Sequence, residues 1–216
     1  IDREKYDIIG TGFAFRYWDT IDFYPDIYVN VDHVVLTKNI DEIKEYILKK
    51  KSRAYILSIK IKEVWEDIID DGSIIFIEEL QQYRGSVLSY MVNWCSGSIA
   101  CFVGIDGYRK ISIIGVDCDY IEFIKESEKQ KDGSLKIIKT PEINPNYFFD
   151  DYHRKGDYYN VPRGQEIHMK SWEELSYICD FINKMNPHIS REIKNYNDKT
   201  SISEYITTED LNSFIN

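Results

Sequence analysis

The residues of this chain that could carry chemistry stand where predicted strands end. Gly10-Thr11-Gly12 comes directly after the strand-like run of residues 6–9. Glycines in such a turn let backbone N–H groups approach a phosphate or a ribose. The dinucleotide fingerprint GxGxxG is not met, because Phe15 stands three residues after Gly12. The turn therefore predicts either a phosphate-binding loop or a plain tight turn.

Two aspartates follow the predicted strand of residues 110–115. Asp117 and Asp119 form an Asp-x-Asp pattern, with which many sugar-nucleotide transferases hold a divalent cation and a diphosphate. Carboxylate oxygens suit hard cations such as Mg²⁺ or Mn²⁺. In the other interpretation Asp117 alone binds a ribose or a base, and Asp119 is solvated.

A histidine precedes a predicted helix start. Ser171-Trp172-Glu173-Glu174 reads as a capping box that opens a helix, and His168 comes just before it. A histidine over the strand ends would titrate near neutral pH, as a general base must. The alternative is a surface or structural residue, which we expect of His153 and His188.

Tyrosines are concentrated late in a polar stretch that covers residues 118–170. They occur in the aromatic run of residues 146–152 and again at Tyr158 and Tyr159. These side chains either pack the stretch onto the domain or hydrogen-bond a leaving phosphate or a sugar. A long segment of this kind is typical of a lid.

These candidates require a framework of alternating strands and helices. The predicted strands are residues 6–9, 26–30, 53–59, 73–77, 110–115 and 189–196, and the predicted helices are residues 37–50, 61–68, 98–105, 171–183 and 208–215. Such alternation predicts an α/β fold, doubly wound around a mainly parallel sheet. Ligands of these sheets bind beyond the C-terminal strand ends.

Length and composition limit the function classes. The chain has 216 residues, which predicts a single domain with a lid insertion at about 118–170. Its net charge of −10 argues against nucleic acid as a partner. The four cysteines form no CxxC pair, which favours a reducing, cytoplasmic setting. Because residue 1 is Ile, we expect the chain to be part of a larger protein.

Residues 96–117 resemble a block of the bacterial lipooligosaccharide sialyltransferases. In that block Ser96-Gly97 would open a helix, Gly107-Tyr108-Arg109 would precede a strand, and Gly115-Val116-Asp117 would close it. Gly10-Thr11-Gly12 resembles the first-strand turn of that family, Asn30 stands at its second-strand Asn, and Ser171 onward resembles the helix after its catalytic histidine. Residues 144–152 and the His168-x-x-Ser171-Trp172 stretch are also similar to transferase-like proteins of bacterial surface-polysaccharide clusters.

The resemblance implies a Rossmann-like, sialyltransferase-type fold and a metal-independent transfer of an acid sugar, with inversion, from a CMP-activated donor. His168 would deprotonate the acceptor hydroxyl, and tyrosines of the lid would hydrogen-bond the departing phosphate. The implied nucleotide-binding residues are Gly10, Thr11, Gly12, Asn30, Ser96, Gly97, Gly115 and Asp117, and the implied catalytic residues are His168, Tyr120, Tyr158 and Tyr159.

The chain departs from the family at two residue positions and in the spacing of the lid tyrosines. Thr11 replaces an Asn of the first turn, and Asn93 stands where the family has an Arg before the Ser-Gly pair. Stabilisation of negative charge would then come from Arg154 or Arg163, or be missing. Sialic acid, Kdo or a related acid sugar would suit the donor site.

The expected acceptor is a surface glycan or a lipid-linked glycan, as in lipopolysaccharide or capsule synthesis. By analogy the chain would self-associate and work in the cytoplasm or at the inner face of the membrane. No bound cofactor is expected. One alternative function is a transferase or pyrophosphoryl-transfer enzyme that uses a nucleoside diphosphate and a metal on Asp117 and Asp119. The other is a non-catalytic nucleotide-binding module of a larger glycan-assembly protein.

Overall fold

The computed structural model describes residues 2–68, 71–83, 87–116, 118–119, 121–160, 164–197 and 200–215. The chain forms two compact units, each assembled from two stretches of sequence. The first unit comprises Ile1–Tyr83 and Ile121–Pro162, and the second comprises Arg84–Tyr120 and Arg163–Asn216. Residues 118–170, expected as one lid, are therefore divided between the units. Among the described residues, no helix has both the length and the apolar character needed to cross a membrane.

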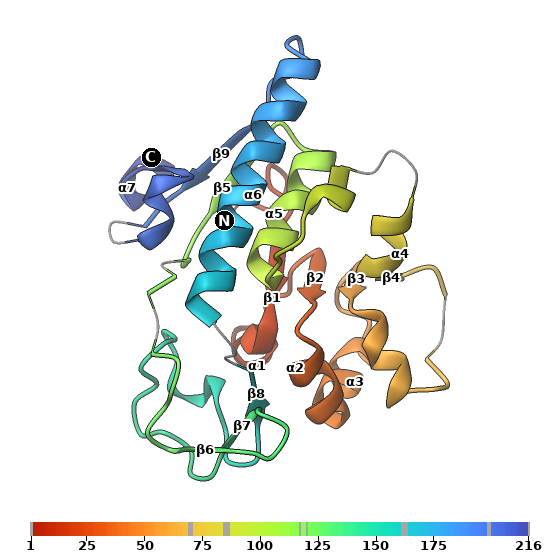
Figure 1. Cartoon of the computed structure of the whole chain (residues 1–216), viewed down its shortest axis with the longest axis vertical. Coiled ribbons are helices and arrows are strands. Elements are labelled where there is room, and N and C mark those ends of the chain that lie inside the picture. Colours follow the sequence, from red (N-terminus) through yellow and green to blue (C-terminus); the bar gives the residue numbers. More distant parts are fainter. Residues whose placement is uncertain are drawn as a thin grey trace. The chain divides into compact units, whose positions relative to one another are not determined.

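The first unit is built on a four-stranded parallel sheet, shown in red to yellow in Figure 1. Its strands are β1 (Ile9–Thr11), β2 (Ile27–Asn30), β3 (Ala54–Leu57) and β4 (Ile74–Phe76), and its helices are α1 (Phe15–Ile21), α2 (His33–Lys38), α3 (Ile40–Leu48) and α4 (Ile77–Gln82). The predicted mixed α/β fold with a parallel sheet is confirmed. Strands follow chain order in this sheet, so the reversal that defines double winding is not seen among its described strands.

A cluster of tyrosines forms the centre of the first unit's core. Tyr28, Tyr46 and Tyr55 are almost completely buried, and their rings meet edge to face at centroid distances of 5.1–6.3 Å. Along α3, Ile43, Tyr46 and Ile47 are buried, the spacing of one helix face. Strand β2 is buried along its whole length, as a central parallel strand usually is.

One predicted helix of the first unit is wrong. Residues 61–68 were expected to be helical, but the structure has a 3₁₀ turn at Ile59–Glu63. The carboxylate of Glu78 accepts the Ser58 hydroxyl and, at 2.7 Å, the Ile59 N–H. This long-range contact fixes the chain after β3, and Ile61 and Trp65 then bury their side chains without a longer helix.

Residues 121–160 carry a small antiparallel sheet of their own. Its strands are β6 (Ser127–Lys129), β7 (Leu135–Ile137) and β8 (Tyr158–Tyr159). The Asn39 side chain fastens β8 to the end of α2, because its amide donates to the Tyr158 carbonyl and its oxygen accepts the Tyr158 N–H, both at 2.9 Å. This part of the predicted lid is thus built into the first unit.

The second unit has a three-stranded parallel sheet in the order β10-β9-β5. Its elements are α5 (Ser96–Gly107), β5 (Lys110–Ile113), α6 (Gly164–Met185), β9 (Glu192–Asn195), β10 (Thr207–Thr208) and α7 (Leu211–Ile215). Helix α5 is buried on nearly all sides. Further 3₁₀ turns lie at Gly12–Ala14 and Asp150–Tyr152 in the first unit and at Val87–Tyr90 and Ser201–Glu204 in the second.

The predicted helix start at the Ser171 capping box is wrong, because α6 begins seven residues earlier, at Gly164. Ser171 is fully buried inside this helix, and its hydroxyl donates to the His168 carbonyl at 2.7 Å. The expected capping carboxylate of Glu174 instead accepts the N–H groups of Val92 and Asn93, each at 2.9 Å. Local spacing suggested a helix start, but a contact across 81 residues uses the carboxylate.

Candidate functional site

At the C-terminal edge of the first unit's sheet, polar groups beyond β3 and β4 bond one another, whereas those beyond β1 and β2 form the candidate site. Beyond β3 and β4, the Glu78 carboxylate satisfies Ser58 and the backbone of Ile59. Beyond β1 and β2, the glycine turn, Asn30 and Asp32 lie close together, because Thr11 pairs with Val29 across the two strands. Ligands of parallel sheets bind at this edge. The half formed by β1 and β2 is therefore the candidate site.

Gly10 and Thr11, expected in a turn after a strand at residues 6–9, lie within β1 (Ile9–Thr11), and the turn begins at Gly12. The end of this glycine segment makes close contact with one tyrosine of the aromatic run. Gly12 has a φ of +62°, which favours glycine. A Cβ on Gly12 would lie 2.4 Å from the hydroxyl oxygen of Tyr152. That oxygen accepts the Phe13 N–H at 3.1 Å. The Tyr152 hydroxyl thus occupies the position from which a phosphate oxygen would meet this backbone amide.

Tyr152 is a neutral hydrogen-bond donor at physiological pH. Burial raises the pKa of its hydroxyl, and the nearby charge of Asp32 raises it further. The Tyr152 oxygen accepts the Phe13 N–H, and the Tyr147 ring stacks on the Tyr152 ring with 3.4 Å between the centroids. The hydroxyl proton is then what Tyr152 can offer to a ligand.

Asn30 lies where the sequence places it, at the end of β2, but it is only 1% exposed. Its amide donates to the Tyr28 hydroxyl at 3.0 Å, which in turn donates to the Gly12 carbonyl at 2.9 Å. This buried chain fixes the conformation of the glycine turn from below. Asn30 therefore acts on the turn through Tyr28.

Asp32 is a site residue that the sequence analysis missed. Its carboxylate caps α2 by accepting the N–H groups of Val34 and Val35, at 2.9 and 3.1 Å. Burial raises the pKa of this carboxyl group. An acidic residue shortly after the second strand was visible in the sequence, and such residues bind ribose hydroxyls in α/β nucleotide sites. Tyr152 was also visible, inside the aromatic run, but was not selected.

Gly10 is explained by packing alone. A Cβ at this position would lie 2.3 Å from two ring atoms of Trp18 and 3.1 Å from Pro25. The indole therefore packs directly on the backbone of β1, and the absent side chain leaves room for it.

Replacing Gly10 by alanine should lower the free energy of unfolding by about 1–3 kcal/mol, the usual cost of overpacking. Gly107→Ala is the matched control, because nothing lies within 4 Å of its added Cβ and alanine favours a helix by up to about 1 kcal/mol. Urea unfolding followed by circular dichroism measures both. If Gly10→Ala unfolds like the wild type, the indole is not packed on this backbone.

His153 is buried under the site and has a structural role. It is 4% exposed and packs against Tyr147, Tyr152 and Tyr159 at ring distances of 5.1–5.3 Å. Burial lowers its pKa to about 4, although the charge of Asp157 acts in the opposite direction. The folded unit therefore holds a neutral imidazole.

This imidazole should make the first unit sensitive to acid. In the unfolded chain, His153 is protonated as the pH falls below about 6.5, whereas in the folded unit it stays neutral until the pH is about 4. The free energy of unfolding therefore falls on acidification. We expect a loss of about 2 kcal/mol between pH 7 and 5 and about 3 kcal/mol by pH 4. Urea midpoints of wild type and His153→Gln across this range test it. Equal pH slopes for the two proteins would contradict the assignment.

Tyr158 and Tyr159 lie in β8 and are held by local contacts. The Tyr159 hydroxyl accepts the Ile124 N–H at 3.2 Å and donates to Ser127 at 3.0 Å. The Tyr158 ring packs under the ammonium groups of Lys38 and Lys136. These contacts give both tyrosines a structural function in the small sheet, and their predicted contact with a phosphate stays a prediction.

The remaining predicted site residues belong to the second unit. Ser96 and Gly97 open α5, whose N-cap is Cys95, and a Cβ on Gly97 would lie 3.3 Å from the Trp172 ring. His168 lies on α6 and is partly exposed. The predicted nucleotide-binding residues are thus divided, with Gly10, Thr11, Gly12 and Asn30 in the first unit and Ser96, Gly97 and Gly115 in the second.

The loop after β5 is anchored on α6. Gly115 has a φ of +77° and Cys118, unusually for a residue with a Cβ, a φ of +53°. The Trp172 indole N–H donates to the Cys118 sulfur at 3.0 Å, and the Gln165 amide donates to the Cys118 carbonyl at 2.7 Å. These two bonds hold the left-handed conformation in place.

The proposed metal pair cannot be described as a pair. Asp117 lies outside the described residues, as do Tyr120 and Arg163, whereas Asp119 is described and exposed. In the part of the chain that the structure covers, no three His, Cys, Asp or Glu side chains are close enough to share a metal ion.

Arg154, expected to stabilise negative charge in place of the family's Arg, has other partners, and so does Asn93, which stands at that Arg position. Arg154 pairs with Asp151 and, at 3.1 Å, with Glu42. The Asn93 amide donates to Glu174 at 2.7 Å, so this side chain fastens the chain before α5 to α6.

Comparison of the chain with models of known protein families, with curated proteins and with solved structures finds no match.

Proposed function

We propose that this chain is a glycosyltransferase that moves an acid sugar from a CMP-activated donor to a surface-glycan acceptor without a metal ion. The observation that carries the proposal is the group at the ends of β1 and β2, where the Tyr152 hydroxyl bonds the Phe13 amide of the glycine turn beside Asp32. The Phe13 N–H is used by the Tyr152 oxygen, so the group that can donate to a phosphate oxygen is the neutral Tyr152 hydroxyl, and the Asp32 carboxylate suits a ribose hydroxyl. The similarity of residues 96–117 to the sialyltransferase block supports CMP as the nucleotide.

The proposed reaction is a displacement at the anomeric carbon of the donor. The acceptor hydroxyl oxygen forms the new bond to this carbon, the bond from the carbon to the phosphate oxygen breaks, and CMP leaves with the electron pair. His168 takes the acceptor proton. Donors aimed at the phosphate stabilise the charge that develops on it, which is the usual share of an electrostatic site. For the fold, we propose a Rossmann-like, sialyltransferase-type arrangement. For the location, we propose the cytoplasm.

A thermal-shift panel tests the proposal. Binding of a ligand at 100 times its Kd stabilises a fold by about 2.7 kcal/mol, so we expect CMP to raise the Tm in the presence of EDTA. CDP, UDP, GDP and ADP, each with EDTA or Mn²⁺, complete the panel. A shift only with a nucleoside diphosphate and Mn²⁺ would favour the metal-dependent alternative on Asp117 and Asp119. No shift with any nucleotide would overturn the proposed site.

Two hydroxyl deletions locate the phosphate contact. Tyr152→Phe and Tyr159→Phe each remove a hydroxyl that accepts one backbone N–H, so their costs in stability should be similar. We expect the stabilisation by CMP to fall in Tyr152→Phe and to persist in Tyr159→Phe. The reverse result would restore Tyr159 as the phosphate-binding tyrosine.

A further inference from the structure

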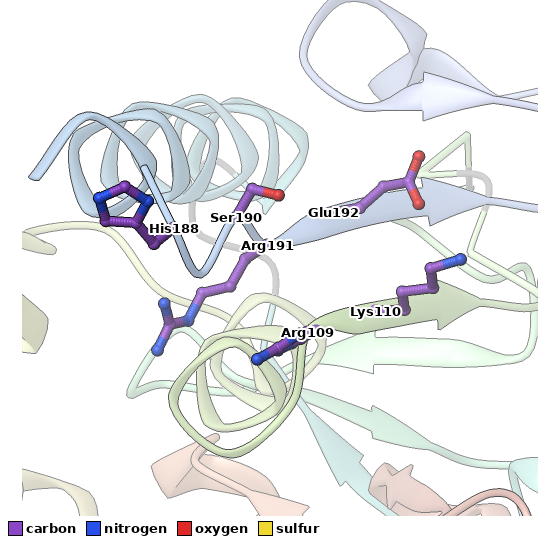
Figure 2. Close-up of a pocket in the computed structure, with 6 residues that line it drawn as sticks. All are labelled: Arg109, Lys110, His188, Ser190, Arg191 and Glu192. Carbon is purple, nitrogen blue, oxygen red and sulfur yellow. The ribbon is translucent and has the colours of Figure 1, made fainter. Parts of the chain in front are cut away.

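A polar cavity lies at the starts of β5 and β9, at the edge of the second unit's sheet opposite the loop that follows β5. It has a volume of about 500 Å³ and is lined by Arg109, Lys110, His188, Ser190, Arg191 and Glu192. Figure 2 shows these side chains around the starts of β5 and β9 and on the turn that follows α6. The cavity shares no residue with the proposed donor site, which is formed at the C-terminal ends of strands, where ligands of parallel sheets bind.

The walls of the cavity are preformed. Asn186 to Ile189 make a turn closed by a 2.9 Å hydrogen bond from the Ile189 N–H to the Asn186 carbonyl, with Pro187 at the position that favours proline. The Asn183 side chain then fixes Arg191, accepting its N–H at 2.6 Å and donating to its carbonyl at 2.8 Å. His188 and Arg191 are therefore presented by an ordered backbone.

The charge of the cavity is opposite to that of the chain. It has three permanent cations, Arg109, Lys110 and Arg191, and one carboxylate, Glu192, in a protein of net charge −10. The Glu192 carboxylate pairs with Lys194 at 3.2 Å, although Lys110 is its neighbour across the strands. Among the described residues, none of the three cations forms an ion pair.

Arg191 also has a structural contact. Its guanidinium donates to the Ile105 carbonyl, in the last turn of α5, at 2.6 Å and to the Ile189 carbonyl at 3.1 Å. Carbonyl oxygens orient a guanidinium but do not neutralise it. Arg109 and Lys110 are exposed. The carbonyl contacts of Arg191 do not involve them, so their positive charges remain available to a ligand.

We propose that this cavity binds the phosphate group of a small phosphorylated molecule. Guanidinium groups match phosphate oxygens in paired hydrogen bonds, and an ammonium group adds a point charge. A volume of about 500 Å³ lies within the usual range for small-molecule sites and exceeds what a bare phosphate needs. The phosphate comes from a soluble metabolite or from a lipid headgroup, and the experiment separates these two sources.

Calorimetric titration with inorganic pyrophosphate, and cosedimentation with vesicles that contain phosphatidic acid, test the proposal in 0.15 M salt. The full chain is compared with the double variant Arg109→Gln/Lys110→Gln. The control is Lys129→Gln/Lys131→Gln, which removes the same charge from two exposed lysines of the first unit. Unchanged melting curves without ligand establish that both variants are folded.

We expect the Arg109/Lys110 variant to weaken binding at least about tenfold, equal to about 1.4 kcal/mol, and the control to bind like the wild type. This loss with pyrophosphate assigns a soluble ligand, and the same loss with vesicles alone assigns a lipid headgroup. Equal weakening in both variants, or no binding of either probe, overturns the proposal. Stabilisation by CMP should persist in the Arg109/Lys110 variant, so the two sites succeed or fail separately.

Discussion

Replacing Arg16 by glutamine should lower the free energy of unfolding by about 3–5 kcal/mol, the usual cost of removing one partner of a buried ion pair. The Arg16 side chain is only 2% exposed. Its guanidinium donates to Asp157 at 2.6 and 3.0 Å, to Glu42, and to the Tyr152 carbonyl at 2.6 Å. Without it, the Asp157 carboxylate stays buried with no cation.

The same contacts explain the ionisation of Arg16. Burial lowers its pKa, but hydrogen bonds to Asp157 and Glu42 outweigh this effect and raise the pKa above the ordinary value. These bonds join α1 and α3 to the residues that follow the aromatic run. Arg16 therefore holds Tyr152 over the glycine turn, and its loss should also weaken the stabilisation by CMP.

The control for this prediction is Arg3→Gln. Arg3 pairs with Asp26 at 2.8 Å, but its side chain is 40% exposed, and exposed pairs contribute about 0–1 kcal/mol. A double variant, Arg16→Met with Asp157→Asn, should recover part of the loss, since it removes both buried charges. Urea unfolding of the wild type and these three variants measures the losses. A loss in Arg16→Gln no larger than in Arg3→Gln would show that the network does not hold the first unit together.

The sequence predicted elements well where local pattern determines them. Residues 26–30 and 53–59 contain β2 and β3, because an apolar run of β-branched and aromatic residues is typical of a buried parallel strand. The end of β2 was also correct, so Asn30 could be placed at the C-terminal edge of the sheet. What Asn30 contacts there could not be predicted.

The contacts that shape the candidate site connect distant parts of the chain. Tyr152 meets Phe13 across 139 residues, and Arg16 meets Asp157 across 141. No spacing rule identifies such pairs. The start of α6 shows the same limit, because Glu174 has the right spacing for a capping box but bonds Asn93 instead. Local signals identified β2, β3, β4, β5 and β9, whereas β1 lies later than predicted and β6, β7, β8 and β10 were not predicted.

The same distinction affects the tyrosines. Tyr158 and Tyr159 were selected as adjacent polar aromatic residues. In the structure Asn39 bonds the Tyr158 backbone, two lysines pack on the Tyr158 ring, and Ser127 accepts the Tyr159 hydroxyl. Tyr152 belongs to a run in which packing and ligand binding were equally good explanations. Only its contact with the glycine turn separates it from its neighbours, and that contact is not written in the run itself.

His168→Ala should lower kcat of the proposed transfer by about 10²–10⁴, the usual contribution of a general base. This corresponds to about 2.7–5.5 kcal/mol of activation free energy. The imidazole is partly exposed on the second turn of α6. The His168→Ala variant should therefore fold without leaving a buried cavity. Affinity for CMP should change little, because a base that acts on the acceptor does not hold the nucleotide.

Lys170→Ala is the matched control for His168. Lys170 lies two residues further along the same helix, is exposed, and pairs with Glu166 at 2.7 Å, so its loss tests the effect of truncating a side chain on this helix. Single-turnover transfer from CMP-sialic acid and CMP-Kdo, together with CMP titration, measures both variants. Retained CMP binding with turnover lost only in His168→Ala supports an enzyme with a histidine base. Normal turnover in His168→Ala removes the histidine from the mechanism, and CMP binding without turnover in the wild type would favour the binding-module alternative.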